Sequence, residues 1–171
     1  MRLKLVKPGP EHERAAMEFR AEFLAEGDEH IYGASGLSRH EVYANWLKGL
    51  GETAPGRVRQ TMFFSFDGET LIGAVAVRHT LNDYLRRIAG HIGYSVRPCQ
   101  RRKGYAKEQL RLALDECAHL GIARALVCCD EWNIASAATI LALGGEEEET
   151  SVDEDGAVIR RFWVDTGMEN A

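Results

Sequence analysis

The spacing of apolar side chains divides the first third of the chain into one strand and two helices. Residues 2–6 alternate between apolar and polar, as in a short strand, and a helix begins at Pro10 with its apolar side chains on one face. Gly27 ends that helix, and a glycine-containing loop follows. Residues 38–41 match a capping box, which predicts that a second amphipathic helix begins there and continues to about Gly49.

A period-two pattern predicts strands in the middle of the chain. Residues 61–66 and 70–79 flank Asp67-Gly68, a dipeptide typical of a tight hairpin. A longer polar connection over residues 80–87 then leads to a strand over residues 89–96. We expect these three strands to be joined as successive hairpins.

The last part of the chain returns to alternating helices and strands. A long amphipathic helix follows Gly104, a strand covers residues 123–129, and a helix of small residues covers 133–143. A final hairpin turns at Asp155-Gly156. The predicted order of elements is β-α-α-β-β-β-α-β-α-β-β.

Composition narrows the class of protein. With 171 residues, 45% of them hydrophobic, the chain is expected to form a single domain over residues 1–171. The net charge of −5 argues against general affinity for nucleic acid. The charge is uneven, because residues 97–111 carry six basic side chains against Glu108 alone, whereas residues 146–149 and 153–155 are acidic. A focused basic patch on an acidic protein suits a small polyanion.

The cysteines, histidines and apolar runs indicate where the protein works. The four cysteines show no Cys-x-x-Cys spacing, which is typical of thiols in a reducing compartment. The six histidines lack metal-ligand spacing, so we expect no metal site. No apolar run approaches the length of a membrane span, and the N-terminal residues lack the apolar stretch that is typical of a signal peptide. We therefore expect a cytoplasmic protein that binds neither nucleic acid nor membranes.

A basic, glycine-containing turn lies between the predicted strand 89–96 and the following helix. Such a turn directs backbone N–H groups and the positive end of the helix dipole at one point, and Gly104 lets a ligand approach the backbone. A solvated helix terminus is the alternative. Yet each positive charge there opposes the helix dipole by about 0.3–1 kcal/mol. The cluster of Arg101, Arg102 and Lys103 therefore favours a bound diphosphate.

The spacing within this turn resembles a known signature. Arg101-x-x-Gly104-x-Ala106 is similar to (Q/R)-x-x-G-x-(G/A), the pyrophosphate signature of the GNAT (Gcn5-related) N-acetyltransferases. Asn133-Ile134-Ala135-Ser136 resembles the Asn-x-x-(Ala/Ser) that follows the family's fifth strand. The resemblance implies an α+β GNAT fold: a mixed, mostly antiparallel seven-stranded sheet, splayed between strands 4 and 5 and flanked by about four helices.

The resemblance also implies a reaction. In this family acetyl-CoA donates an acetyl group to a primary amine, on a small molecule or on a protein N-terminus or lysine. The amine attacks directly in a ternary complex, and the protein is a monomer or a homodimer. The residues implied to bind acetyl-CoA are Ser95, Val96, Arg101, Arg102, Lys103, Gly104, Tyr105, Ala106, Asn133 and Ser136. A non-catalytic acyl-CoA-binding regulator is the alternative, because Ile140 stands where many relatives carry a tyrosine that acts as the general acid.

The groups that would move protons are less clearly marked. His91 is a candidate base because the unperturbed pKa of histidine is about 6.5. Glu131 and Tyr94 are further candidates, and proton transfer through water is the default. On a regular strand His91 and Tyr94 would point to opposite faces, so only one would reach the cleft.

Two polar segments could line the acceptor side. Residues 28–36 include His30 and Tyr32, and in the family the segment between the first two helices lines the substrate groove. The end of the strand 70–79 and its connection include His79 and Asn82. A solvated turn explains this second segment equally well.

Overall fold

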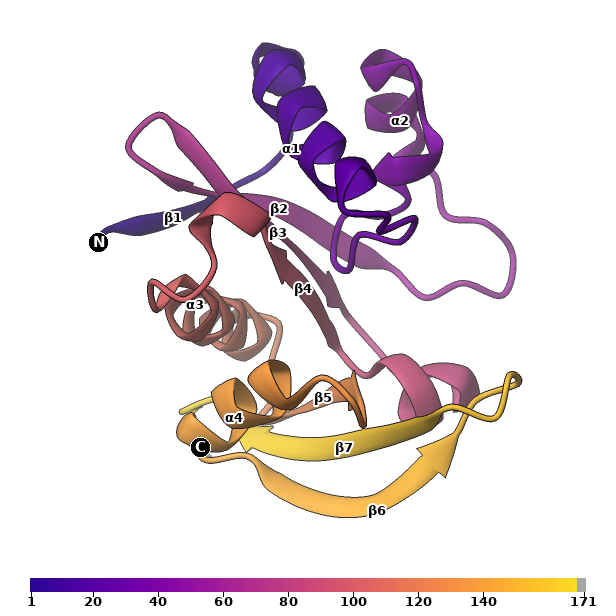
Figure 1. The fold of residues 1–171 in the computed structure, drawn as a ribbon. Coiled ribbons are helices and arrows are strands. Elements are labelled where there is room, and N and C mark those ends of the chain that lie inside the picture. The colour runs from indigo at the N-terminus through magenta and orange to yellow at the C-terminus, as the bar shows by residue number, and fades with distance from the viewer. Residues whose placement is uncertain (169–171) are drawn as a thin grey trace.

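The computed structural model describes residues 1–168, which fold around one seven-stranded sheet (Figure 1). The strands are β1 (Leu3–Val6), β2 (Gln60–Asp67), β3 (Thr70–Arg78), β4 (Ile92–Val96), β5 (Arg124–Asp130), β6 (Glu146–Val152) and β7 (Val158–Asp165). The α-helices are α1 (Glu13–Ala25), α2 (Tyr43–Gly49), α3 (Tyr105–His119) and α4 (Ile134–Ala142). Short 3-10 helices lie at Pro10–His12, Leu37–Arg39 and Pro98–Gln100, and a π-helix lies at Leu85–Ala89.

The strands follow the order β1-β2-β3-β4-β5-β7-β6 across the sheet. The β4–β5 pair is parallel, and the other neighbouring pairs are antiparallel. This confirms the predicted fold class. Both faces are covered: α1 and α2 pack on one side, and α3 and α4 on the other (Figure 1). Side chains of β3 serve both cores, because Val75 and Val77 face α3 whereas Ala74 faces α1. A register shift in the β2–β3 pair, between Ser65 and Phe66, changes the alternation, so Leu71 also lies in the α1 core.

The sheet divides between β4 and β5. β4 pairs with β3 along its whole length, from Ile92 to Val96, but its register with β5 consists of Ile92 opposite Val127. Beyond that pair the two strands diverge, as Figure 1 shows. Beyond Ile92 the edge of β4 that faces β5 is therefore not paired with that strand, and a cleft opens at this point.

A buried glutamine holds α3 against the β2–β4 half of the sheet. Gln109 has no exposed surface. Its Oε1 accepts a hydrogen bond from Ser65 Oγ (2.9 Å), and its Nε2 donates to the carbonyl oxygens of Ala74 (2.9 Å) and Ser95 (3.1 Å). A Cβ at Gly73 would collide with Gln109 Oε1, so a glycine is required there. One side chain thus fixes the helix to three strands beside the cleft.

The predicted capping box at residues 38–41 is wrong. Residues Leu37–Arg39 form a 3-10 helix instead, and α2 begins at Tyr43. Ser38 Oγ donates to the carbonyl oxygen of Glu29 (2.7 Å) and so fastens the preceding loop. That loop lies against the sheet, because a Cβ at Gly33 would collide with the carbonyl oxygens of β3 and β4.

The predicted strand over residues 89–96 is too long at its start. Leu85–Ala89 form the π-helix, and Gly90 has φ +64°, so β4 begins only at Ile92. The run of apolar and β-branched residues hid this irregular turn. His91 therefore lies outside the strand, and the parity argument that set it against Tyr94 does not apply.

The buried network at Gln109 makes a stability prediction. Gln109→Ala would leave the Ser95 and Ala74 carbonyl oxygens without their donor, so we expect the free energy of unfolding to fall by about 2–4 kcal/mol. Urea denaturation measures this change. Lys107→Ala, an exposed position on the same helix, should shift it by less than about 0.5 kcal/mol. Equal stability of the two variants would contradict the bracing role of Gln109.

Candidate functional site

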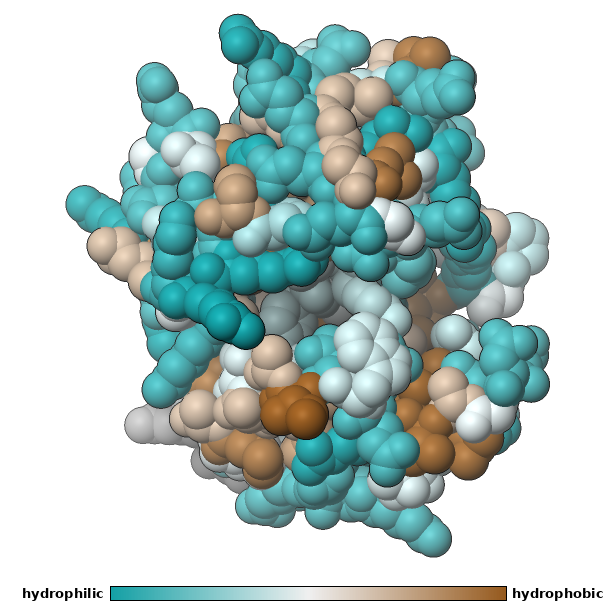
Figure 2. All heavy atoms as spheres, viewed as in Figure 1, coloured by the Kyte–Doolittle hydropathy of each residue, from teal (hydrophilic) through white to brown (hydrophobic). Residues whose placement is uncertain are grey.

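The cleft between the halves of the sheet contains two adjoining cavities. The larger has a volume of about 630 Å³ and reaches the start of α3, and the smaller, of about 320 Å³, lies toward the π-helix. Five residues line both: His30, Tyr32, Tyr94, Asn133 and Ser136. Figure 2 shows a hollow in this face, between the α1 side and the α4 side. These shared residues form the junction between the two cavities.

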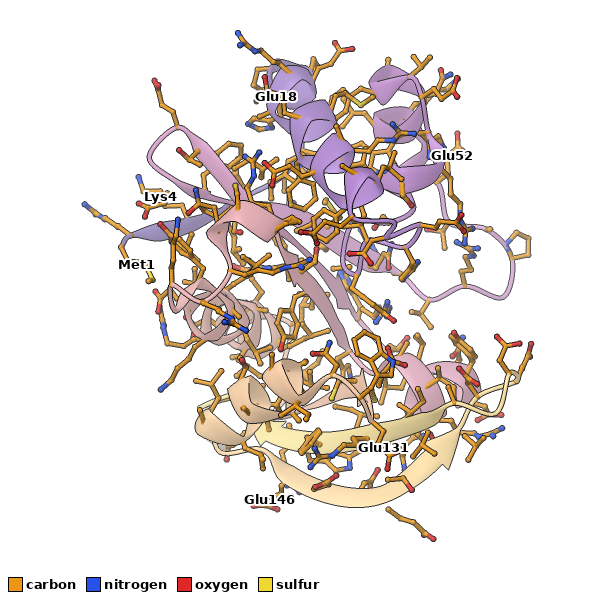
Figure 3. All side chains as sticks on the ribbon, in the orientation of Figure 1. Met1, Lys4, Glu18, Glu52, Glu131 and Glu146 are labelled. Atoms are coloured by element: carbon orange, nitrogen blue, oxygen red, sulfur yellow. The ribbon has the colours of Figure 1, made fainter. Side chains whose placement is uncertain are left out.

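The larger cavity ends at the N-terminus of α3. Gly104 caps the helix with φ +85°, and it has no side chain to accept a hydrogen bond from the first turn. The N–H groups of Tyr105, Ala106 and Lys107 lack intrahelical acceptors at this position. A Cβ at Gly104 would meet Met1 Cε at 3.3 Å, and Figure 3 shows Met1 beside this turn. The turn presents several donors to an anion.

The basic turn is less positive in the fold than in the sequence. Arg97 forms an ion pair with Glu22, whose pKa it holds below the usual range, and also donates to the carbonyl oxygen of Leu71 (3.1 Å). Arg101 Nη1 lies 3.0 Å from Glu26 Oε2. Lys103 Nζ donates to Gln100 Oε1 (2.9 Å) and is not part of the cavity wall. Arg102 and Lys107 are the basic residues of the wall without such an ion pair.

The structure brings together the residues that the GNAT resemblance implied for acetyl-CoA, with the exception of Lys103. The larger cavity is lined by Ser95, Val96, Arg101, Arg102, Gly104, Tyr105, Ala106, Asn133 and Ser136. Ser95 Oγ is buried and has no hydrogen-bond partner among the described residues. Since buried hydroxyls are normally paired, it can serve a polar group of a ligand lying along β4.

Tyr94 lies at the junction of the two cavities. Its hydroxyl and Ser136 Oγ share a hydrogen bond of 2.9 Å, and burial raises the pKa of Tyr94 to about 12. The hydroxyl is therefore protonated at neutral pH and available as a donor. Ile140, at the position of the family's tyrosine, is fully buried in the core and takes no part in the cleft.

Asn133 both caps α4 and lines the two cavities. Its Oδ1 accepts a hydrogen bond from the N–H of Ser136 (3.1 Å) and so caps α4. This capping bond leaves the amide nitrogen of Asn133 as a donor toward both cavities.

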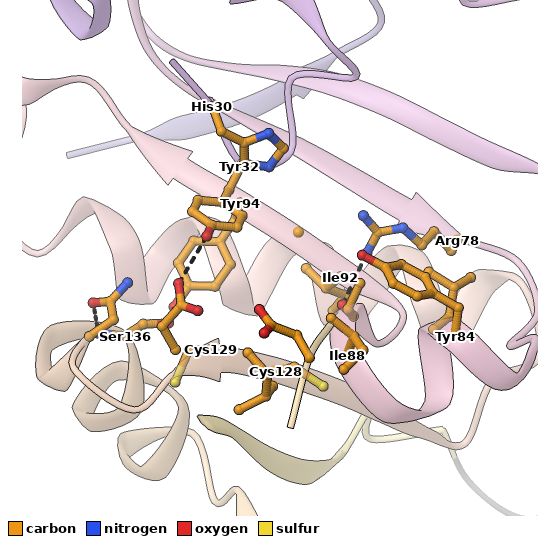
Figure 4. A pocket seen from close by; sticks show the side chains of 17 residues that line it. His30, Tyr32, Arg78, Tyr84, Ile88, Ile92, Tyr94, Cys128, Cys129 and Ser136 are labelled. Carbon is orange, nitrogen blue, oxygen red and sulfur yellow. Dashed lines mark hydrogen bonds between the residues drawn. The ribbon is translucent and has the colours of Figure 1, made fainter. Parts of the chain in front are cut away.

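The loop between α1 and α2 adds two aromatic rings to the junction, as Figure 4 shows. The rings of His30 and Tyr32 meet edge to face with centroids 4.6 Å apart, and the Tyr32 hydroxyl donates to Asp130 Oδ2 (2.9 Å). His30 is exposed along part of its surface, but desolvation by the cavity wall, together with the positive charges of Arg39 and Arg78, lowers its pKa. His30 is therefore neutral near pH 7 and can accept a proton.

His91 does not reach the cleft, which argues against its role as the base. The side chain is 7% exposed, and its Nδ1 accepts a hydrogen bond from the backbone N–H of Leu126 (2.9 Å). Burial, with the positive charges of Arg78 and Arg86, lowers the pKa of His91 to about 4. The imidazole joins the residue before β4 to Leu126 within β5 and is held neutral there.

The other site residues predicted from the sequence, on the acceptor side and as a base, do not line either cavity. Glu131 is exposed on the C-terminal half of the molecule, as Figure 3 shows, whereas the preceding Asp130 lines the smaller cavity. His79 shares a hydrogen bond with Thr61 Oγ1 (2.8 Å), and Asn82 Oδ1 accepts from the N–H of Leu85 (2.9 Å). Neither side chain lines a cavity.

The two ends of the same polar segment, Arg78 and Tyr84, do line the smaller cavity (Figure 4). The sequence pattern placed this segment on the acceptor side but did not single out either residue. Arg78 is the last residue of β3. Its position at a strand end was the one feature of the sequence that could have indicated a place in the site.

Two further searches concern the described residues alone. Within residues 1–168, no group of three or more His, Cys, Asp or Glu side chains is arranged to hold a metal ion. In the same range, no helix has both the length and the apolar character needed to cross a membrane.

Comparison with known proteins identifies relatives. A family model described as acetyltransferase (GNAT) domain matches residues 2–146. A search by sequence among curated proteins finds no match. Among solved structures, RimJ of Mycobacterium smegmatis in complex with CoA-disulfide is similar, with a TM-score of 0.71 and 20% identity over 99% of this chain and 84% of that chain.

Two other solved structures show the same architecture. RimL, a ribosomal L7/L12 alpha-N-protein acetyltransferase in complex with coenzyme A, has a TM-score of 0.71 and 14% identity over 98% of this chain and 96% of its own. A spermidine N-acetyltransferase chimera of Vibrio cholerae SpeG and hSSAT has a TM-score of 0.67 and 16% identity over 97% of each chain. At these identities the likeness concerns the fold.

The burial of His91 predicts a specific pH dependence of stability. Its pKa is about 4 in the fold and 6.5 ordinarily, so the unfolded chain binds a proton that the folded chain does not as pH falls between these values. Stability should therefore fall over this range, with a contribution of up to about 1.4 kcal/mol per pH unit. His91→Gln should flatten this part of the profile in urea unfolding. The exposed control His119→Gln should reproduce the parent's slope, and a parent-like slope in both variants would contradict a neutral buried His91.

Proposed function

Because the chain belongs to the GNAT acetyltransferase family, we propose that it is an acetyl-CoA-dependent N-acetyltransferase acting on a primary amine. One observation carries the proposal. A cavity that begins at a donor-rich helix N-terminus meets a second cavity at Tyr94, Ser136 and His30. Two substrates can thus occupy separate spaces and meet at groups able to move protons, which a direct transfer in a ternary complex requires.

The donor substrate would lie in the larger cavity. The first-turn N–H groups of α3, together with Arg102, are suited to hold its diphosphate. The free edge of β4 over residues 93–96 offers backbone groups to the pantetheine arm, and Ser95 Oγ adds an unpaired hydroxyl. Bound acetyl-CoA would supply the acetyl group as a thioester. The N-terminus of α3 and β4 thereby orient it toward Tyr94.

Tyr94 is suited to act as the general acid. Its position carries this role: the hydroxyl is protonated at neutral pH, as in any tyrosine, and its bond to Ser136 Oγ fixes its direction at the junction. The pKa of about 12 makes Tyr94 a weaker acid than a free tyrosine. A proton held there can pass to the leaving sulfur. Tyr94, on β4, would thus replace the tyrosine that many relatives carry at the position of Ile140.

His30 is suited to act as the general base. It lines both cavities, and its lowered pKa keeps the ring neutral near pH 7. Asp130, bonded to Tyr32, places a carboxylate near it that can hold the incoming amine as a cation. The ammonium would lose one proton to solvent before attack, and His30 would take the second proton from the nitrogen as the C–N bond forms.

The proposed function allows two kinds of acceptor, a protein amine or a small-molecule amine. The similar structures include a protein N-terminal acetyltransferase and a spermidine acetyltransferase, so both protein and small-molecule amines belong in a first panel. A non-catalytic acyl-CoA-binding regulator remains the second candidate, since Ile140 lies in the core. Turnover with any amine decides between them.

The first prediction concerns the donor site. Calorimetric titration should show micromolar or tighter binding of acetyl-CoA to the parent, and Gly104→Glu should abolish it, because the carboxylate would occupy and repel the diphosphate position. Gly121→Glu is the matched control. Gly121 ends the same helix with φ +79°, close to the +85° of Gly104, so both variants introduce the same backbone strain. Absence of binding by the folded parent would overturn the assignment.

The second prediction concerns the proton-transfer groups. With acetyl-CoA and the amine panel, release of free CoA should fall about 100-fold or more in His30→Gln, and Tyr94→Phe should also lose activity. The parent's kcat/KM should decline as pH drops through the lowered pKa of His30, and that limb should disappear in His30→Gln. His119→Gln is the control. Parent-like rates and pH profile in His30→Gln would exclude His30 as the base.

A further inference from the structure

The smaller cavity contains an arginine that is not ion-paired. Arg78 Nη1 donates to the carbonyl oxygens of Ala89 (3.1 Å) and Gly90 (3.2 Å), which anchors the side chain against the end of the π-helix. The ion pairs within residues 1–168 do not include Arg78. A partly buried cation normally has a carboxylate partner. Arg78 therefore presents uncompensated positive charge to the cavity.

A carboxylate lies in the same cavity without a basic partner. Asp130 Oδ2 accepts the Tyr32 hydroxyl, and the ion pairs of the described residues do not include Asp130 either. The cavity's other carboxylate, Asp153, accepts hydrogen bonds from the N–H groups of Asp155 (2.9 Å) and Ala157 (2.8 Å) and so stabilises the turn between β6 and β7. Arg78 and Asp130 thus line one cavity without forming an ion pair with each other or with another described residue.

Their arrangement separates the two charges along the cavity. In Figure 4 Arg78 and Tyr84 lie at one end, and His30, Tyr32 and Tyr94 lie at the other. Tyr32, and with it Asp130, therefore belongs to the end where the acetyl group would be delivered. A ligand with a positive group at one end and a negative group at the other would satisfy both residues.

The remaining wall favours a small ligand. The π-helix side contributes Leu85 and Ile88, and this helix is fixed to the β6–β7 hairpin by Arg161, whose Nε donates to the Arg86 carbonyl oxygen (3.0 Å). A braced wall and a volume of about 320 Å³ suit a compact molecule rather than an extended chain.

We infer that the acceptor is a small amino carboxylate, an amino acid or a related compound, whose amine lies at Asp130 and whose carboxylate lies on Arg78. The inference rests on the proposed function and specifies its acceptor. The planar guanidinium of arginine suits a carboxylate. A polypeptide N-terminus carries an amide where an amino acid carries its carboxylate, so it would leave Arg78 uncompensated.

The reaction then balances without a further reactant. The amine nitrogen attacks the acetyl carbon, a C–N bond forms and the C–S bond breaks. The ammonium group held at Asp130 first loses one proton to solvent, which leaves a neutral amine that can attack. As the C–N bond forms, the nitrogen's second proton passes to His30, and the leaving sulfur takes a proton from Tyr94. His30 then returns its proton to Tyr94 through solvent, so one proton is released in each turnover. The products are an N-acetyl amino carboxylate and free CoA.

The test compares each acid with its own amide. The parent, acetyl-CoA and the twenty amino acids, each paired with its carboxamide, are assayed for release of free CoA. We expect at least one amino acid to exceed its carboxamide by about tenfold or more in kcat/KM, since the amide lacks the charge that Arg78 requires. Arg78→Gln should bring this ratio close to one, because kcat/KM falls further for the acid than for its amide.

Three further variants make the outcome specific. Asp130→Asn should lower kcat/KM for acid and amide in parallel, because both carry the amine. Arg57→Gln, exposed and outside the cavity, should leave the ratio unchanged. If Arg78→Gln does not fold, as judged by its melting temperature, Arg78→Lys keeps the charge without the planar fork and should still reduce the ratio.

Several results would overturn the inference while the proposed function stands. These are equal turnover of acids and amides by the parent, or equal losses on both in Arg78→Gln, which would show that Arg78 does not recognise the acceptor's carboxylate. Acetylation of spermidine or a peptide N-terminus but of no amino acid would also overturn it, as would acetyl-CoA binding without turnover of any amino acid. Failure of the parent to bind acetyl-CoA would instead remove the proposed function itself.

Discussion

The pairing of β4 with β5 at Ile92 and Val127 is the constraint on which the rest of this structure depends. A continuous ladder would have used the backbone groups of residues 93–96 and closed the sheet. Because the strands separate instead, the sheet has two halves with a cleft between them, and both cavities open along it. The shared core of α3, α4 and strands from both halves keeps the molecule whole around this division.

The two halves of the sheet stay apart because polar contacts outside the cleft fix each half to the elements that pack against it. Gln109 fixes α3 to β2, β3 and β4, and the ion pair of Arg97 with Glu22 fixes the end of β4 to α1. On the opposite half, Arg161 joins β7 to the π-helix. Such buried or half-buried polar contacts are directional, so they set the width of the cleft more sharply than apolar packing would.

Charge is distributed differently outside and inside the cleft. At the basic turn, Arg97 and Arg101 have acidic partners from α1 and the residue after it, so much of the positive run in the sequence is neutralised. Inside the smaller cavity, Arg78 and Asp130 remain separate, although each would gain from an opposite charge. Unpaired charges in a cavity reduce stability, and this arrangement is typical of a site that a ligand completes.

The sequence by itself determined the order of strands and helices, the donor-rich turn before α3 and its likeness to the GNAT signature. Those features depend on neighbours in the chain, such as period-two alternation, Asp67-Gly68 and the spacing from Arg101 to Ala106. Only the tertiary structure decided which polar side chains meet. His91 proved to be a buried link, whereas His30, Arg78 and Asp130, far apart in the chain, line one cavity. Periodicity fixes the face on which a residue lies, but the π-helix, the start of β4 and the path of residues 28–36 depend on contacts between distant segments, which the local pattern does not contain.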